Sequence, residues 1–77
     1  MVKYRKKTVV VEVEGPFYIR KMPWPKGVKM VDKTPKIQTS KGLLVVAEGD
    51  MIITEVSGER YPCDPDVFEL TYEYIKD

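Results

Sequence analysis

The sequence predicts a mainly β domain, either a small antiparallel barrel or a strongly bent sheet of five to seven short strands, with one short helical turn near residues 65–69. Three observations lead to this prediction. Short runs of β-branched and apolar residues recur along the chain, turn-forming residues separate them, and helical periodicity is almost absent. Because 77 residues can build only a small core, we expect a single domain over residues 1–77.

Strand candidates follow one another along the whole chain. The run 8–14 ends in alternation, which favours a strand, and 17–21 would pair with it as a hairpin across a Gly-Pro break. The clearest hairpin joins 36–39 to 43–48 through a short glycine-containing turn. The expected strands are residues 8–14, 17–21, 36–39, 43–48, 51–56, 59–61 and 70–75, and residues 28–31 are a further candidate.

A helix start is encoded late in the chain. Asp64 is suited to cap a helix, Pro65 to its first position, and Asp66 to the positive end of its dipole. We therefore expect one helical turn over 65–69. The expected turns are 49–50 and 57–58, and 32–36 is expected to be a polar connection that contains proline.

Charge is distributed unevenly although the net charge is only +1. Residues 1–41 carry 11 Lys or Arg and three acids, a net charge of +8, whereas residues 42–77 carry two bases and nine acids, a net charge of −7. One interpretation is that the two halves interleave in a sheet and form cross-strand ion pairs of modest value. The other is a bipolar surface whose basic face binds an anionic partner.

The single cysteine bears on the compartment. Cys63 has no partner for an internal disulfide, which favours a reducing environment. The apolar run that follows the basic residues 1–7 is short and interrupted by acids, unlike a signal-peptide core or a membrane span. We therefore expect a cytoplasmic protein without a membrane contact.

Catalysis is the least expected class of function. The chain has no histidine to act as a base beside Cys63 or to complete a zinc site, so this thiol is expected to be a small core residue. Asp64, Asp66 and Glu69 lack the spacing of a calcium loop, and helix capping accounts for both aspartates. We expect no catalytic residues, no metal and no cofactor.

Trp24 is the strongest candidate for a binding residue. Prolines on both sides lower the entropy cost of presenting it, and tryptophan is enriched among interface anchors. The alternative is that Trp24 folds back as a lid on the small core. We expect the binding surface in the basic, irregular stretch 20–36, and its candidate residues are Arg20, Lys21, Trp24, Lys26 and Lys29.

The start of the chain offers a second candidate surface. It is basic and contains a tyrosine, a combination that suits nucleic acid. Most basic N-termini are simply solvated and mobile, so a mobile arm is the favoured interpretation of residues 1–7. The residues of this nucleic-acid candidate are Lys3, Arg5, Lys6 and Lys7.

A dense pattern of turn, aromatic and acidic residues occupies 49–73: Gly-Asp, then Gly-Glu, Tyr-Pro-Cys-x-Pro-Asp, Phe-Glu and Thr-Tyr-Glu. With the basic start, this pattern resembles a group of small phage and prophage proteins of uncharacterised function. The matching positions are Lys3-Tyr4-Arg5-Lys6-Lys7, Val9 to Glu12, Gly49-Asp50, Ile52, Gly58-Glu59, Tyr61-Pro62-Cys63, Pro65-Asp66, Phe68-Glu69 and Thr71-Tyr72-Glu73.

The resemblance covers about half of the chain and has three departures. Thr8, Met51 and Asp64 stand where Pro, Trp and Lys are common in the family. If the lysine that family members carry at this position contacts an acidic partner, this chain lacks that contact because it has Asp64 instead. The resemblance implies a phage or prophage origin and assigns no activity.

These observations favour a small, phage-derived, non-enzymatic binding protein, an accessory factor that engages a host protein or sequesters a ligand in the host cytoplasm. One alternative is a nucleic-acid-binding accessory protein that uses the basic N-terminal half. The other is a self-assembling or virion-associated structural protein, in which exposed edge strands pair between copies as a homo-oligomer.

Overall fold

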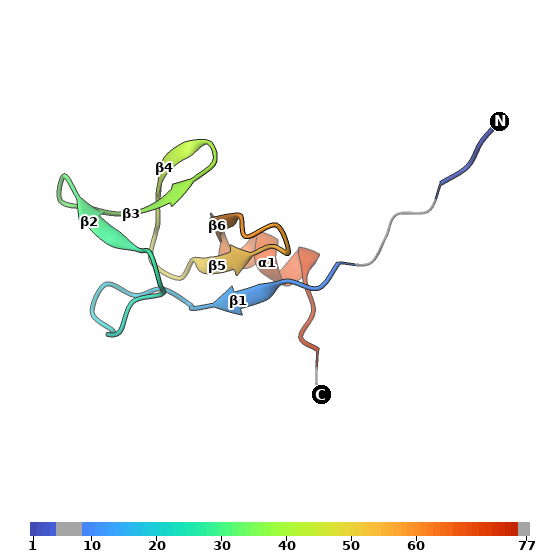
Figure 1. Cartoon of the computed structure of the whole chain (residues 1–77). Coiled ribbons are helices and arrows are strands. Elements are labelled where there is room, and N and C mark those ends of the chain that lie inside the picture. Colours follow the sequence, from blue (N-terminus) through green and yellow to red (C-terminus); the bar gives the residue numbers. More distant parts are fainter. Residues whose placement is uncertain (5–8, 76–77) are drawn as a thin grey trace.

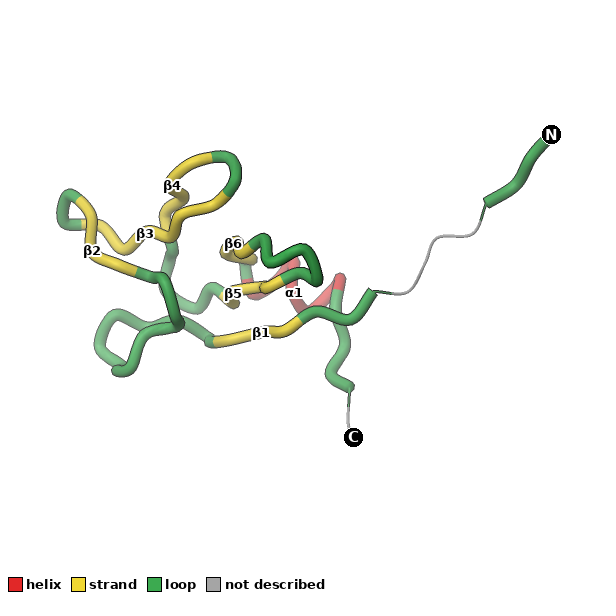
Figure 2. The backbone as a smooth tube through the Cα atoms, in the orientation of Figure 1, coloured by secondary structure: helices red, strands yellow, loops and turns green. Residues whose placement is uncertain are grey.

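The structure, a computed structural model, describes residues 1–4 and 9–75. It confirms a mainly β fold, in which six short strands form two three-stranded antiparallel sheets and one helix follows (Figures 1 and 2). No ladder joins the two sheets within the described residues, so they do not close into a barrel there. The elements are β1 Glu12–Glu14, β2 Lys29–Val31, β3 Thr34–Thr39, β4 Gly42–Val45, β5 Met51–Thr54, β6 Arg60–Cys63 and α1 Pro65–Thr71.

The first sheet has the strand order β1-β5-β6. Its central strand β5 buries both Ile52 and Ile53, whose side chains point to opposite faces. Ile53 lies opposite Val13 and Tyr61. The Tyr61 hydroxyl lies 3.1 Å from the hydroxyl of Tyr72, directly after α1. The end of the helix therefore packs against the face of the sheet that carries Ile53.

The second sheet has the order β2-β3-β4 and begins with a tight hairpin. Asp32 and Lys33 join β2 to β3 with φ values of 50° and 66°. Two successive left-handed residues are typical of the type I′ turn, whose twist matches that of antiparallel strands. Pro35 lies opposite Met30 inside the hairpin, and its carbonyl oxygen accepts a hydrogen bond from the Val46 N–H at 2.9 Å.

One core lies between the two sheets, where β3 and β4 contact β6. The loop between β1 and β2 inserts Phe17, which is only 1% exposed. The Phe17 N–H donates to the Asp50 carbonyl at 2.8 Å, and the Gly49 N–H donates to the Phe17 carbonyl at 2.6 Å. The loop therefore closes the core, which consists of Phe17, Val28, Ile37, Val46 and Ile52 with Trp24 packed against them.

Two predicted strands are wrong. Residues 17–21 form loop and turn because Phe17 bonds to the 49–50 turn, and β1 pairs with β5 instead of with this segment. Residues 70–75 form no strand because α1 continues to Thr71. Tyr72 ends the helix and donates its N–H to the Phe68 carbonyl at 2.9 Å. The helix predicted over 65–69 is thus confirmed and is longer than expected.

The predicted helix cap is also confirmed. Oδ1 of Asp64 accepts hydrogen bonds from the N–H groups of Asp66 at 2.8 Å and Val67 at 3.4 Å. The Phe68 and Tyr72 rings stack with centroids 5.4 Å apart. Even so, no residue of α1 is buried: Phe68 is half-buried, and so is Cys63, which was expected in the core.

Two further placements concern the ends of the chain. In the part of the chain that the structure describes, α1 is too short to cross a bilayer. Residues 1–4 lie away from both sheets and are exposed (Figure 1). Of the predicted basic arm, Arg5, Lys6 and Lys7 lie outside the described residues.

Candidate functional site

The charge asymmetry of the sequence becomes a separation in space. Residues 20–41, which form β2, β3 and the loop before them, carry seven bases and one acid, a net charge of +6. Residues 42–75, which include β5, β6 and α1, carry eight acids and one base, a net charge of −7. Because β4, Gly42–Val45, contains no charged residue, the sheet β2-β3-β4 and the loop before it are basic, whereas the remainder of residues 42–75 is acidic.

Two lysines meet on the outer face of the basic sheet. Ile37 and Thr39 of β3 are buried, so Lys36 and Gln38, which alternate with them, point outward. The strand register places Lys29 directly opposite Lys36, where the Cβ atoms of a pair lie about 4.5–5.5 Å apart. Neither lysine forms a salt bridge with any residue that the structure describes.

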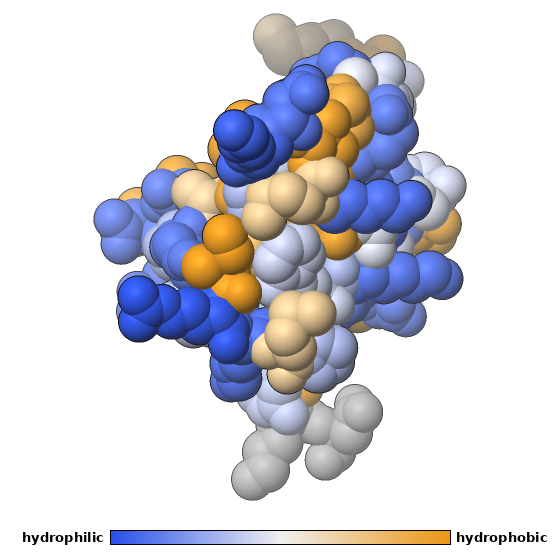
Figure 3. Space-filling model, turned by 90° about the vertical axis from the view of Figure 1, so that its left-hand side faces the viewer, coloured by the Kyte–Doolittle hydropathy of each residue, from blue (hydrophilic) through white to orange (hydrophobic). Residues whose placement is uncertain are grey.

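Apolar side chains flank these lysines. Val45 lies opposite Lys36, and Leu43 lies opposite Gln38. Leu43 and Val45 are 50% and 56% exposed. Figure 3, which looks onto the end of the molecule that carries β2 and β3, shows apolar residues lying between strongly hydrophilic ones. We call the outer surface of the β2-β3-β4 sheet the basic face, and its residues are Lys29, Val31, Lys36, Gln38, Leu43 and Val45.

The basic face contains a shallow hollow of about 290 Å³. None of its six lining residues is acidic, and two are the opposed lysines. The hollow therefore offers positive charge beside an apolar wall. Its lining residues are Gly27, Lys29, Val31, Lys36, Gln38 and Leu43.

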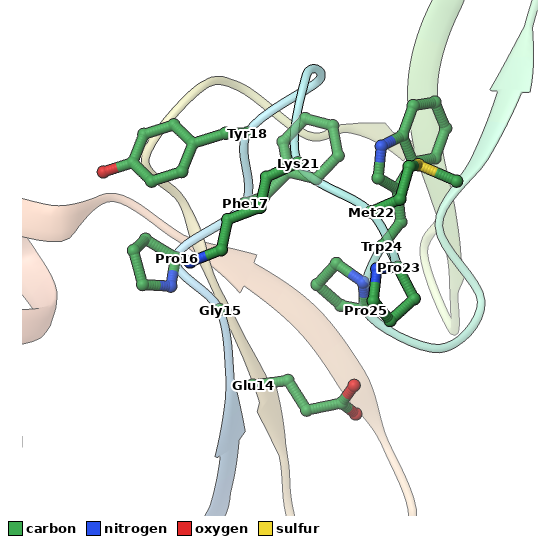
Figure 4. Close-up of a pocket in the computed structure, with 10 residues that line it drawn as sticks. All are labelled: Glu14, Gly15, Pro16, Phe17, Tyr18, Lys21, Met22, Pro23, Trp24 and Pro25. Atoms are coloured by element: carbon green, nitrogen blue, oxygen red, sulfur yellow. The ribbon is translucent and has the colours of Figure 1, made fainter.

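A second hollow, of about 240 Å³, surrounds Trp24 (Figure 4). The Trp24 ring meets the Phe17 ring edge-on with centroids 5.4 Å apart, and its Nε1–H donates to the Ile19 carbonyl at 3.2 Å. Trp24 is half-buried and acts as a lid on the core, which is the alternative that the sequence left open. Figure 4 shows Tyr18 on the other side of Phe17, pointing away from Trp24.

Arg60, the single base of residues 42–75, holds the backbone segment at Lys26 that leads into β2. Its Nη2 donates to Oε1 of Glu14 at 2.5 Å, its Nε donates to Oγ1 of Thr54 at 3.0 Å, and its Nη1 donates to the Lys26 carbonyl. The second Glu14 oxygen accepts from the Lys26 N–H at 3.0 Å. Gly27 follows with φ 87°, and a Cβ there would lie 3.1 Å from Nη1 of Arg60.

Two titratable groups in the acidic part are shifted toward their neutral forms. Burial, with smaller contributions from Asp64 and Asp50, raises the pKa of the Cys63 thiol. The hydrogen bond with Tyr72 is the main cause of the raised pKa of Tyr61, and burial adds to it. A protonated thiol is a weak nucleophile. Among residues 1–4 and 9–75, no cluster of three potential metal ligands occurs.

The predicted binding residues do not form one site. Lys29 lies on the basic face, whereas Lys21 and Trp24 line the second hollow. The Arg20 side chain is exposed in a turn. Lys26 is exposed as well, but its backbone is held by the Glu14–Arg60 pair. The stretch 20–36 thus spans two separate surfaces joined by the segment around Lys26.

Lys36, Gln38 and Leu43 were not predicted as site residues. A two-residue turn at 32–33 would have placed Lys29 opposite Lys36, and this spacing was the available signal. Pro35 favoured the prediction of a connection over 32–36, because proline is unfavourable inside a strand.

Comparison of this chain with known protein families, with curated proteins and with solved structures found no match. The chemistry of its own residues therefore carries the functional argument.

Proposed function

We propose that this chain is a non-enzymatic binding protein whose basic face contacts an acidic, partly apolar surface of another protein. The observation that carries the proposal is the pair Lys29 and Lys36, directly opposite each other on two neighbouring strands. Like charges in this position destabilise a sheet. Such an arrangement is favourable when a partner places a carboxylate between the two ammonium groups.

The apolar residues of the basic face favour a protein over a nucleic acid. Leu43 and Val45 offer apolar area next to the lysines, which matches a partner segment that contains both acidic and apolar residues. Proteins that bind single strands use aromatic side chains for stacking. The six residues that line the hollow include no aromatic side chain.

The chemistry of the remaining groups supports binding over catalysis. The thiol of Cys63 has a raised pKa and is a poor nucleophile at neutral pH. Asp64 is engaged as a helix cap, and Oδ2 of Asp50 accepts a hydrogen bond from the Ala47 N–H at 2.9 Å. The resemblance to phage proteins suggests a host protein in the bacterial cytoplasm as the partner.

The direct test measures binding of a fluorescent peptide in which Glu alternates with Leu, by anisotropy at about 50 mM salt, where charges are weakly screened. We expect saturable binding that Lys29→Glu/Lys36→Glu weakens by at least about tenfold, since like-charge contacts replace favourable ones. A peptide in which Ser replaces Leu should bind more weakly. Equal binding by the wild type and the variant would refute the proposal.

A matched control separates the position of the charges from their number. Lys33→Glu/Lys41→Glu makes the same change in net charge, but in the two turns of the same sheet. This variant should keep most of the affinity for the Glu-Leu peptide. A short DNA duplex of equal charge tests the nucleic-acid alternative, and tighter binding of DNA than of peptide would favour it.

A further inference from the structure

The outer surface of α1 is the largest unexplained feature of the acidic part. None of its residues is buried. Val67 is 53% exposed and Leu70 is 90% exposed. They lie three positions apart and are therefore neighbours on the helix surface, opposite Phe68, whose ring stacks on Tyr72. An apolar strip thus faces solvent.

Acidic residues alternate with these apolar residues along the sequence of this segment. Asp66 and Glu69 occur within the helix, and Glu73 follows it. The last turn contains no basic residue, so the negative charge is not balanced within α1. We call Asp66, Val67, Glu69, Leu70 and Glu73 the acidic strip.

The acidic strip and the basic face complement each other. Each carries two or three charges of one sign beside two or three apolar side chains. Neighbouring side chains on a helix lie about 5–6 Å apart, which is close to the spacing of about 4.8 Å between strands of a sheet. A helix laid on the basic face would therefore bring carboxylates to the lysines and Leu70 to the apolar residues.

One molecule cannot make this contact with itself. Figure 1 shows α1 well separated from the turn between β2 and β3. The β2-β3-β4 sheet meets the remainder of the domain through β6, on the side that buries Ile37. The outer face of the sheet therefore remains open to another molecule.

We infer that a second copy of this chain occupies the basic face, with its acidic strip docked across Lys29 and Lys36. This inference rests on the proposed function of that face and names one partner for it. Because the two surfaces differ, the contact is heterologous, and repeated contacts generate open chains of molecules instead of a closed dimer. A host protein would then compete with a second copy for the same surface.

Sedimentation velocity of the full chain over a concentration series tests the inference. We expect reversible association at roughly 50 mM salt that falls at least tenfold in affinity at roughly 500 mM, because salt screens the charges. Leu70→Ser should weaken association without loss of folding, since Leu70 is almost fully exposed. A wild type that stays monomeric at every concentration at low salt would overturn the inference.

A mixing experiment makes the test specific. Lys29→Glu/Lys36→Glu retains only the acidic strip, and Glu69→Lys/Glu73→Lys retains only the basic face. Each variant alone should be monomeric, because both of its surfaces then carry the same charge. An equimolar mixture should associate again, because each surface of one variant is complementary to a surface of the other. If the mixture contains only monomers while the wild type associates, another surface is responsible and the inference is wrong.

The peptide assay distinguishes failure of this inference from failure of the proposed function. Glu69→Lys/Glu73→Lys keeps the basic face and should still bind the Glu-Leu peptide. Peptide binding by a wild type that never associates would support the proposed function and reject the second copy. Self-association without peptide binding would reject the peptide-like partner and also the basis of this inference.

Discussion

Arg60 of β6 donates to the carboxylate of Glu14 on β1 at 2.5 Å and, through the same guanidinium, holds the carbonyl of Lys26 at the start of the basic sheet. Arg60 is 18% exposed and Glu14 is 44% exposed. One side chain thus joins the acidic sheet to the segment that enters the basic one. The position of the basic face therefore depends on a residue outside it.

Replacement of Arg60 should destabilise the domain. Arg60→Ala leaves the Lys26 carbonyl and the Glu14 carboxylate without their donor, and we expect a loss of about 2 kcal/mol after allowance for the exposure of Glu14. Arg60→Lys should lose about 1 kcal/mol, because lysine keeps the charge but cannot reach three acceptors in one plane. Urea unfolding measures both values. A loss as small as that of the exposed control Lys41→Ala would contradict the role assigned to Arg60.

Trp24→Ala tests the lid on the core. Removing the indole exposes Phe17, and we expect a loss of about 2–3 kcal/mol for this half-buried ring. Tyr18→Ala is the matched control, since Tyr18 lines the same hollow but points away from Trp24, and it should cost less than about 0.5 kcal/mol. Thermal unfolding followed by circular dichroism compares the two variants. Unchanged stability in Trp24→Ala, together with lost partner binding, would instead make Trp24 an interface anchor.

Lys33→Gly should stabilise the protein. Lys33 has a φ of 66°, which costs a residue with a side chain about 1–2 kcal/mol. Glycine removes this strain but costs about 0.5–1 kcal/mol of chain entropy, so the net gain is about 0.5 kcal/mol. The backbone of Lys41 lies outside the left-handed region, so Lys41→Gly should show only the entropy cost. The chemical denaturation midpoints should move in opposite directions for the two variants, and parallel shifts would refute the turn geometry.

The Cys63 thiol should react slowly at mildly alkaline pH. Burial raises its pKa, so the thiolate fraction at pH 8 is smaller than that of a free cysteine. Alkylation by iodoacetamide across a pH series should therefore reach half of its maximal rate at a higher pH in the folded protein than in the protein unfolded in urea. Coincident profiles would contradict the described environment of Cys63.

Stability should fall as the pH rises above that at which a free tyrosine ionises. The raised pKa of Tyr61 means that the unfolded chain loses this proton first, so the stabilisation is complete below pH 10 and declines above it. Tyr61→Phe should lose about 1 kcal/mol at neutral pH through its missing hydrogen bond, and its stability should decline less steeply in alkali. Urea unfolding of the wild type and of Tyr61→Phe between neutral and alkaline pH measures both stabilities. The difference between the two removes the contribution of the lysines, which both proteins share. Parallel curves would show that Tyr61 does not contribute.

Local rules predicted the elements whose signals lie within a few residues. The Asp64-Pro65-Asp66 cap and the hairpin that contains Ser40 are of this kind, because their hydrogen bonds join close neighbours in the chain. The strand predicted over 17–21 was wrong because the hydrogen-bond partners of Phe17, Gly49 and Asp50, lie far away in the sequence. The pairing of Lys29 with Lys36 was not predicted because Pro35 argues against a strand, although a two-residue turn at 32–33 would have produced this pairing.

The strand predicted over 70–75 failed for a different reason. Its alternation is real, but the capped helix start propagates through Thr71, and the ring stacking of Phe68 on Tyr72 favours helical spacing. A local pattern with no neighbouring strand to pair with could not compete. Leu70 instead lies on the helix surface, where it is 90% exposed.

The separation of charge between the two sheets has a kinetic consequence. With +6 on residues 20–41 and −7 on residues 42–75, the folded chain has a large electric dipole moment despite a net charge close to zero. The electric field of a charged partner would orient this dipole before the surfaces touch. More encounters would then begin in a productive orientation. Added salt should then slow the rate of association more than it hastens dissociation.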